Sequence, residues 1–336
     1  MESLEGLGVG SLKVPPLVGG GFPVAMLQLC SVYYVGALAV HSLIPRFASP
    51  VTPVAPGARK AKPESSRRTK RQQILRESLL SIGPIAVKAA VFCAVEKIHG
   101  LGLGLLYDGA LGFGTSLPAQ AILVACTVLL LDALHDTWFY FTHLLMHRNR
   151  WLYLNVHYLH HQSRDPTPFS GYSLHVVEAL IVFFDEVIVC FLFPMHVNLH
   201  RLYHLYTTLI HIGGHASYEL HPLVPSLEQL LWIVFHGDRV AKGLNTVLYH
   251  NMHHQFPNKN FSLYFTHWDR LCETMKWAYP DEIQRIKKEQ SGKFGEGKGR
   301  RRKHRYYFAL IACMTATLGL SLLAYLLAYN VFLRVA

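Results

Sequence analysis

The stretch His157-Tyr-Leu-His160-His161 lies near the middle of the 336-residue chain and carries a spacing typical of one helical face. Residues three and four positions apart on an α-helix lie on the same side of it, so His157 shares a face with His160 and His161. Imidazole is a neutral nitrogen ligand at pH 7 that suits iron, zinc and copper. The stretch therefore predicts a helix that presents several imidazoles to a metal.

The same kind of spacing recurs three more times. The four motifs are His143-Leu-Leu-Met-His147, His157-Tyr-Leu-His160-His161, His211-Ile-Gly-Gly-His215 and His250-Asn-Met-His253-His254. Since one metal ion rarely takes more than about four to six ligands, ten histidines in four motifs suit two metals. The predicted metal site thus draws on four separate segments of the chain.

A purely structural role, a zinc-protease site or a haem site would account for fewer of the histidines. The chain has 21 histidines, of which 18 fall within 135–267. A single HxxxH pair is usually structural, but four motifs within 143–254 argue against a structural role for the whole set. A zinc protease would need HExxH, which the sequence lacks. A haem protein would need only two axial ligands and would leave most of the histidines without a role.

Composition indicates a membrane protein. Hydrophobic residues make up 51% of the chain and charged residues 16%, against about 25% charged in a soluble domain, and the mean hydropathy is +0.21. The net charge of +11 gathers in two basic blocks, 59–71 and 287–305, that flank apolar stretches, which favours membrane topology over nucleic-acid binding. The six cysteines include no CxxC pair, so we expect small buried side chains rather than a disulfide framework.

Apolar stretches predict an all-α integral-membrane helical bundle. The expected spans are 24–44, 79–95, 117–131 and 308–333, each long enough to cross a bilayer or nearly so. The stretch 176–192 carries Glu178, Asp185 and Glu186, which favours a buried hairpin or a membrane-surface helix over a simple span. The positive-inside rule places both basic blocks and the histidine motifs on the cytosolic face and both termini in the lumen.

This pattern divides the chain into four segments. They are an N-terminal span and basic linker over 1–72, a transmembrane helical hairpin over 73–131, a histidine-rich di-metal domain over 132–280, and a basic linker with a C-terminal transmembrane helix over 281–336.

Three polar residues near the motifs are candidates for orienting the metal ligands. Asp136 precedes the first motif by two helical turns and is expected either to accept the free N–H of a ligand histidine or to be a charge on the helix surface. His175 and Glu178 are three residues apart, which suits either a pair that orients a ligand or a purely structural hydrogen-bonded pair.

Several motifs over 132–274 resemble the fatty acid hydroxylase superfamily. Besides the two HxxHH motifs, they are Asp136-Thr-Trp-Phe-Tyr-Phe-Thr-His143, Pro166-Thr-Pro-Phe169 and Phe265-Thr-His-Trp-Asp-Arg-Leu271. The last two look most like sterol C5-desaturases. The resemblance implies two iron ions and O2 as co-substrate, with no catalytic residue beyond the di-metal centre. It also implies ligand roles for His143, His147, His157, His160, His161, His211, His215, His250, His253 and His254.

The expected function is O2-dependent desaturation or hydroxylation of a lipid in the endoplasmic reticulum membrane, with a sterol as the favoured substrate. A fatty acid or sphingoid-base hydroxylase is the alternative within the same class. The sequence has no fused haem domain, GxGxxG or flavin motif, so a separate cytochrome b5 and an NAD(P)H-dependent reductase are the expected electron donors. Alternatives of other classes are a histidine-rich metal transporter or sensor, whose ligands would lie at mid-membrane depth, and an inactive lipid-binding relative.

Overall fold

A computed structural model of the chain describes residues 18–46, 49–50, 63–108, 117–219 and 245–276, together with Leu227, Glu228, Leu231 and Phe235. Its longer helices are α1 (Gly21–Cys30), α2 (Gly36–Leu43), α3 (Pro63–Leu80), α4 (Ile82–Gly100), α5 (Leu117–Arg148), α8 (Val176–Phe183), α10 (Val197–Gly214) and α12 (Val247–Gln255). Its short helical segments are η1 (Ser31–Val35), η2 (Ile44–Arg46), α6 (Arg150–Leu152), η3 (Tyr153–His157), α7 (Tyr158–His161), η4 (Pro168–Ser170), α9 (Asp185–Ile188), η5 (Val189–Phe191) and α13 (His267–Leu271).

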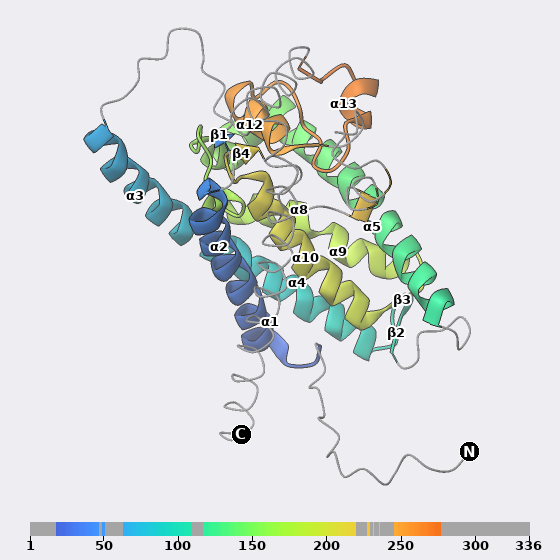
Figure 1. Cartoon of the computed structure of the whole chain (residues 1–336). Helices are drawn as coiled ribbons and strands as arrows, with labels where there is room; N and C mark the ends of the chain where they lie inside the picture. Colours follow the sequence, from blue (N-terminus) through green and yellow to red (C-terminus); the bar gives the residue numbers. More distant parts are fainter. Residues whose placement is uncertain are drawn as a thin grey trace, which may run out of the picture.

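Strands in the described part of the chain are limited to two short pairs. β1 (Ser49–Pro50) pairs antiparallel with β4 (Tyr218–Glu219), and β2 (Leu106–Tyr107) pairs in parallel with β3 (Met195–His196). The predicted all-α bundle is confirmed. Figure 1 shows α12 and α13 gathered at one end of this bundle and the β2–β3 pair at the other.

Within the part of the chain that the structure describes, three helices are long and apolar enough to cross a membrane. They cover Gly21–Leu43, Thr69–Gly100 and Pro118–Arg148, and they overlap the predicted spans 24–44, 79–95 and 117–131. The predicted span 308–333 and the basic block 287–305 lie outside the described residues. The apolar stretch 176–192 forms the short helices α8, α9 and η5, and its three carboxylates are buried.

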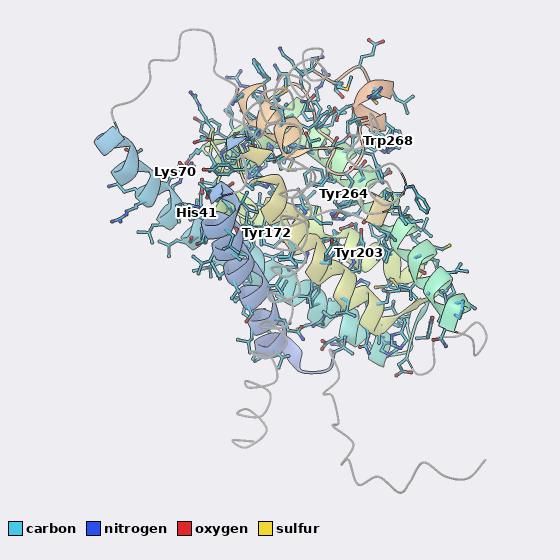
Figure 2. All side chains as sticks on the ribbon, in the orientation of Figure 1. His41, Lys70, Tyr172, Tyr203, Tyr264 and Trp268 are labelled. Atoms are coloured by element: carbon cyan, nitrogen blue, oxygen red, sulfur yellow. The ribbon has the colours of Figure 1, made fainter. Side chains whose placement is uncertain are left out.

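The first long helix contains a π-helical segment, η1, that brings Tyr33 into the middle of the bundle. The Tyr33 hydroxyl donates to the carbonyl of Phe169 at 2.6 Å and accepts from the backbone N–H of Tyr172 at 3.2 Å. The Tyr33 and Tyr172 rings stack with centroids 5.1 Å apart, and Tyr172 lies beside α2 in Figure 2. A π-helical turn shifts side chains relative to a regular α-helix, and here it ties this helix to segment 168–172, next to the histidines.

A buried carboxylate ties α3 to the loop that follows α7. Glu77 is fully buried and accepts hydrogen bonds from the hydroxyls of Ser163, at 2.7 Å, and Thr167. Tyr33, Ser81 and Glu77 thus fix the segment 163–172 between the N-terminal helices and the histidine motifs. Burying these polar groups costs little, because each has a partner.

Candidate metal centre

Nine histidines form two adjoining groups in which the ring nitrogens of each group lie within 4.8 Å of one another. The five-histidine group consists of His143, His147, His157, His161 and His253. The four-histidine group consists of His160, His215, His250 and His254. All are buried except His147, which is partly exposed.

Each HxxHH motif supplies both groups. His157 and His161 are four residues apart and belong to the five-histidine group, whereas His160 between them turns to the other group. The motif on α12 does the reverse, with His250 and His254 in the four-histidine group and His253 in the five-histidine group. This differs from the prediction that one motif converges on one point. Two positions four residues apart share a face, and the remaining histidine is rotated away from that pair.

Because each HxxHH motif supplies histidines to both groups, the two groups lie next to each other. The rings of His161 and His254 lie 5.1 Å apart between centroids, and those of His250 and His253 lie 5.8 Å apart. Since α7 and α12 each contribute to both groups, a shift of either segment would disturb both at once.

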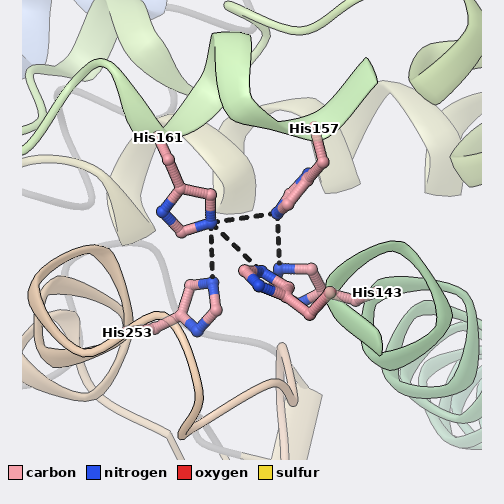
Figure 3. A group of neighbouring side chains, drawn as sticks. His143, His157, His161 and His253 are labelled. Atoms are coloured by element: carbon pink, nitrogen blue, oxygen red, sulfur yellow. Dashed lines mark hydrogen bonds between the residues drawn. The ribbon is translucent and has the colours of Figure 1, made fainter. Parts of the chain in front are cut away.

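The Nε2 atoms of the five-histidine group converge on one another (Figure 3). The Nε2 of His161 lies 3.0 Å from that of His157, 3.1 Å from that of His147 and 3.2 Å from that of His253. The Nε2 of His143 lies 3.1 Å from that of His157. In the four-histidine group, the Nε2 of His250 lies 2.8 Å from that of His215 and 3.1 Å from that of His254.

The opposite ring nitrogens of four of these histidines face hydrogen-bond acceptors. The Nδ1–H groups of His143 and His253 donate to the carbonyls of Phe261 at 2.8 Å and Lys259 at 2.7 Å. The His215 Nδ1–H donates to the carbonyl of His211 at 2.7 Å.

The fourth of these histidines, His157, donates its Nδ1–H to the carboxylate of Glu178 at 2.7 Å. Such partners fix the tautomer and leave Nε2 with its lone pair, as in protein metal sites where carboxylate or carbonyl groups orient the ligand histidines.

Burial keeps these imidazoles neutral. Removal from water, followed by the mutual effect of neighbouring imidazoles, lowers the pKa of His160, His250 and His254 well below the ordinary value of 6.5. Burial likewise lowers the pKa of His215 to about 4. Near neutral pH these side chains therefore carry no charge and present a nitrogen lone pair.

The donor set fits two metal ions. His143 and His157 both use Nδ1–H as a donor, so neither has a proton on Nε2 with which to bridge the 3.1 Å that separates their Nε2 atoms. Lone pairs that point at one another this closely repel unless a cation lies among them. Neutral imidazole is a ligand for iron, zinc and copper, and each group offers enough nitrogens for one ion.

Two aspartates hold the loop whose carbonyl receives the His143 N–H. Asp136 accepts from the backbone N–H groups of Leu263 at 2.9 Å and Tyr264 at 2.6 Å. Asp269 accepts from the N–H groups of Phe261 and Ser262, and also from the hydroxyl of Tyr249 on α12 at 2.8 Å. Asp136 therefore orients a backbone loop, and neither of its two predicted roles describes this contact.

His175 and Glu178, which the sequence predicts to act as a pair, have different partners in the structure. His175 caps the start of α8, where its Nδ1 accepts from the N–H of Val177 at 3.2 Å. Glu178 points instead to His157. The predicted ligand His211 lies outside both groups, and its backbone carbonyl, rather than its ring, contacts His215.

Sequence reasoning did not anticipate the backbone acceptors Phe261 O and Lys259 O, because every residue carries a carbonyl and nothing in its side chain reveals the role. Glu77 was also missed, although one carboxylate at the edge of an apolar stretch is a usable signal of a buried polar contact.

A small cavity adjoins both groups. Its volume is about 20 Å³, which leaves room for roughly one water molecule. Histidines of both groups line it together with Glu178 and His211, and apolar side chains close the rest, among them Phe139, Leu174 and Val182. The cavity therefore touches the candidate metal ligands directly, and its wall combines polar and apolar side chains.

Comparison with known proteins places these elements in a family. Residues 128–274 match the family model for fatty acid hydroxylases. The chain is 29% identical over 155 residues to cholesterol 25-hydroxylase of Rattus norvegicus, covering 45% of this chain and 47% of that protein. It is 31% identical over 162 residues to cholesterol 25-hydroxylase-like protein 2 of Danio rerio, covering 47% and 51%.

A second kind of relative is lathosterol oxidase of Homo sapiens, which is 28% identical over 145 residues, or 42% of each chain. The chain spans about half the length of the curated relatives it matches, and no solved structure matches it. The matched range begins within α5, extends past α13 and holds every histidine of both groups. Residues 128–274 of this chain are thus similar to fatty acid hydroxylase domains.

Proposed function

We propose that this chain is a membrane-bound di-iron oxidoreductase that uses O2 to desaturate or hydroxylate a lipid. The observation that carries the proposal is the convergence of nine neutral histidines, eight of them buried, in two adjoining groups beside a small cavity. Two adjoining metal sites built from nitrogen ligands suit the activation of O2, and the cavity beside them, with room for about one water, has apolar side chains in its wall.

When bound, the two iron ions would supply the electrons and coordination positions for O2 reduction. Hydroxylation converts R–H, O2, two electrons and two protons into R–OH and water, and desaturation releases two waters instead of one. The chain's own residues hold the ligands: Glu178 and the carbonyls of Phe261 and Lys259 orient the imidazoles, and the apolar walls exclude bulk water.

A sterol is the favoured substrate. The relatives that the chain resembles are named for cholesterol and lathosterol, and Pro166-Thr-Pro-Phe169 resembles sterol C5-desaturases. That motif follows α7 in the chain, and Glu77 and Tyr33 hold it in place. A fatty acid or sphingoid base is the alternative within this class.

A metal transporter or sensor fits the placement of the histidines less well. His143 and His147 fall at the last turns of the candidate span Pro118–Arg148 rather than at its middle, and the remaining histidines of the two groups lie on elements beyond the three spans. Ligands that pass an ion across a membrane should lie at mid-depth. The end of the bundle where the histidine groups lie suits a site that receives electrons from soluble donor proteins.

We propose that a separate cytochrome b5 and an NAD(P)H-dependent reductase deliver the electrons, and that the chain resides in the endoplasmic reticulum membrane with the site on the cytosolic side. A site at the cytosolic end of the helices would lie within reach of such donors.

The test is expression in a yeast strain that lacks sterol C5-desaturase, followed by lipid analysis. Restored 5,7-diene sterols would support C5 desaturation. A new hydroxysterol would support sterol hydroxylation instead, and a new hydroxylated fatty acid or sphingoid base would contradict the sterol assignment while leaving the oxidase assignment intact. No new lipid product from a chain shown to hold two irons would contradict both.

A further inference from the structure

His147 is the candidate metal ligand that reaches the surface of the chain. Eight of the nine histidines in the two groups are buried, whereas His147 is partly exposed. An electron that reaches the metals must enter through the surface of the bundle, and electron transfer weakens steeply with distance. Among the described residues, a donor therefore approaches the two groups most closely at His147.

Two tyrosines extend from the five-histidine group toward that surface. The Tyr153 ring lies 5.2 Å from the His147 ring and 6.0 Å from the His161 ring between centroids. The Tyr158 ring lies 6.1 Å from that of Tyr153, and Tyr158 is 44% exposed. A line of ring contacts thus joins two candidate ligands to an exposed side chain.

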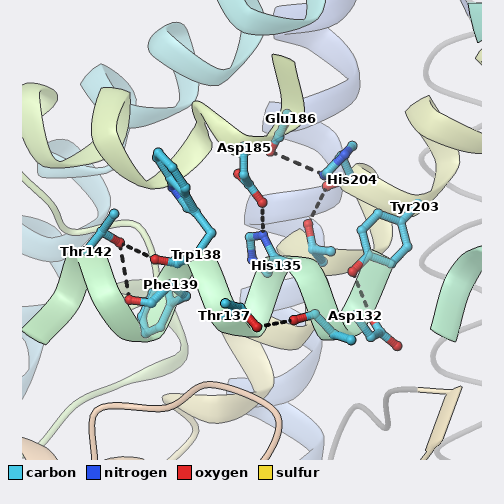
Figure 4. A network of polar contacts seen from close by, with 12 residues as sticks. Asp132, His135, Thr137, Trp138, Phe139, Thr142, Asp185, Glu186, Tyr203 and His204 are labelled. Carbon is cyan, nitrogen blue, oxygen red and sulfur yellow. Dashed lines mark hydrogen bonds and ion pairs between the residues drawn. The ribbon is translucent and has the colours of Figure 1, made fainter. Parts of the chain in front are cut away.

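The interior of the bundle offers no comparable surface among its described side chains. His135 lies on α5 about two turns before His143 and contacts Asp185, as Figure 4 shows. His135, Asp185 and Glu186 are each at most 4% exposed. A partner protein has no access to the histidine groups through these side chains.

The exposed surface near His147 is positively charged. Residues 137–164 contain three arginines, which are Arg148, Arg150 and Arg164, and no lysine, aspartate or glutamate. All three arginines are exposed, and none forms an ion pair with a described residue. Burial raises the pKa of Tyr153 and the charge of Arg164 opposes that rise, so Arg164 lies near the same ring.

The composition of this surface is typical of a protein-binding face. Trp151, between the arginines in sequence, is 65% exposed. Tryptophan, tyrosine and arginine are enriched in protein–protein interfaces, whereas lysine, aspartate and glutamate are depleted. Redox partners form small, transient contacts in which opposite charges speed the encounter. A positive face of this kind fits a partner with an acidic surface.

We propose that Arg148, Arg150, Trp151, Tyr158 and Arg164 form the docking face for an acidic one-electron donor protein. The inference rests on the function proposed above, which requires a separate electron donor. Each encounter oxidises the donor by one electron and reduces the metal centre by one. Two encounters supply the two electrons that one hydroxylation or desaturation consumes together with two protons.

Contact with lipid headgroups is the alternative for this face, because tryptophan and arginine also occur at membrane surfaces. That placement would cover His147, the candidate ligand that is partly exposed. It would leave the described surface without a short path from a donor to the metal groups. The observations therefore favour a protein partner.

The test follows electron transfer from the reduced haem domain of a cytochrome b5 to the full-length, iron-loaded protein in lipid nanodiscs. Stopped-flow absorbance of the haem, without O2, gives the second-order rate constant. Arg150→Glu and Arg164→Glu should each lower it by about 10-fold at low salt. Arg150→Lys and Arg164→Lys keep the charge and should stay close to the wild-type rate. Added salt should slow the wild type and not the glutamate variants, because screening weakens attraction and repulsion alike.

Lys97→Glu is the matched control, because it reverses one exposed charge in the last turn of α4, toward the β2 end of the bundle in Figure 1. Its rate constant should equal that of the wild type. Dithionite, a small reductant that needs no docking face, should reduce every variant at the same rate.

Equal rate constants for Arg150→Glu, Arg164→Glu and Lys97→Glu would overturn the docking face and leave the proposed oxidase function standing. Quenching of Trp151 fluorescence by brominated lipid, measured as the difference between wild type and Trp151→Phe, with those rate constants equal, would make the face a membrane contact. Wild-type protein with two irons that accepts electrons from neither the haem domain nor dithionite would contradict the proposed function, and the inference with it.

Discussion

At the scale of single residues, the structure assigns to individual atoms what the sequence could assign only to motifs. The spacing of histidines along the sequence was enough to select the nine that converge in the structure. It did not reveal that His160 and His161, adjacent in sequence, face different groups, because this depends on the rotation of a short helical segment that begins in a π-helical turn. Nor did it reveal backbone acceptors, which have no side-chain signature.

Glu178 gives a residue-scale prediction. Its carboxylate accepts the Nδ1–H of His157, and partners of this kind typically contribute about 10–100-fold to metal affinity or activity. Glu178→Leu should therefore lower metal retention during dialysis by that factor, as measured by elemental mass spectrometry. His175→Ala is the control, because His175 caps α8 and contacts neither group. Equal metal retention in the two variants would refute the role of Glu178.

At the scale of elements, short segments rather than the long helices determine where the histidines point. The uncharged run 117–131 predicted the first part of α5, and the helix continues beyond that run to Arg148. Its end follows from Asn149, whose side chain accepts from the N–H groups of Trp151 and Leu152 and so begins a new helix. The contacts of the segment 260–274 with α5 were not predictable, because they join residues more than a hundred positions apart. Its contact with α12 joins Tyr249 and Asp269, which are 20 positions apart, and no motif marks that pair.

Asp269 gives an element-scale prediction. It is fully buried and accepts from Tyr249, Phe261, Ser262 and Thr274. Asp269→Ala leaves these donors unpaired and should cost about 2–5 kcal/mol in free energy of unfolding. The thermal midpoint in detergent should fall, and metal should be lost with it.

Glu273→Gln is the comparison for Asp269→Ala, because Glu273 is exposed and its hydrogen bonds with Lys259 and Arg270 use its backbone carbonyl and N–H. Its midpoint should change little. A midpoint for Asp269→Ala equal to that of Glu273→Gln would show that the loop is not held through this carboxylate.

At the scale of the whole molecule, the bundle keeps a cluster of neutral histidines out of water. The pKa values of these histidines in the folded chain lie below 6.5, so between those values and 6.5 the unfolded chain binds more protons than the folded chain. Stability of the metal-free protein should therefore be complete above about pH 6.5 and fall as the pH decreases below it.

Thermal unfolding of the metal-free protein between pH 5 and pH 8 measures this dependence. A midpoint that stays constant or rises as the pH falls from 6.5 would contradict the neutral, buried state of the histidines.

The orientation in the membrane is a second whole-molecule prediction. The two basic blocks predict that Arg67 and Arg301 face the cytosol while both termini are lumenal. Epitope tags at either end should resist protease in sealed microsomes and become sensitive when detergent is added. Tags cleaved in sealed microsomes would overturn the orientation and with it the cytosolic placement of the metal groups.

The central claim is that two separate groups of histidines each hold a metal ion. Elemental mass spectrometry of the purified full-length chain measures it most directly, in wild type, His161→Ala, His250→Ala and the control His267→Ala, whose histidine lies in neither group. We predict about two metal ions per chain for wild type and control, and about one for each of the other two variants. Wild-type protein with one ion or none, or retention of both ions in His161→Ala and His250→Ala, would contradict the account.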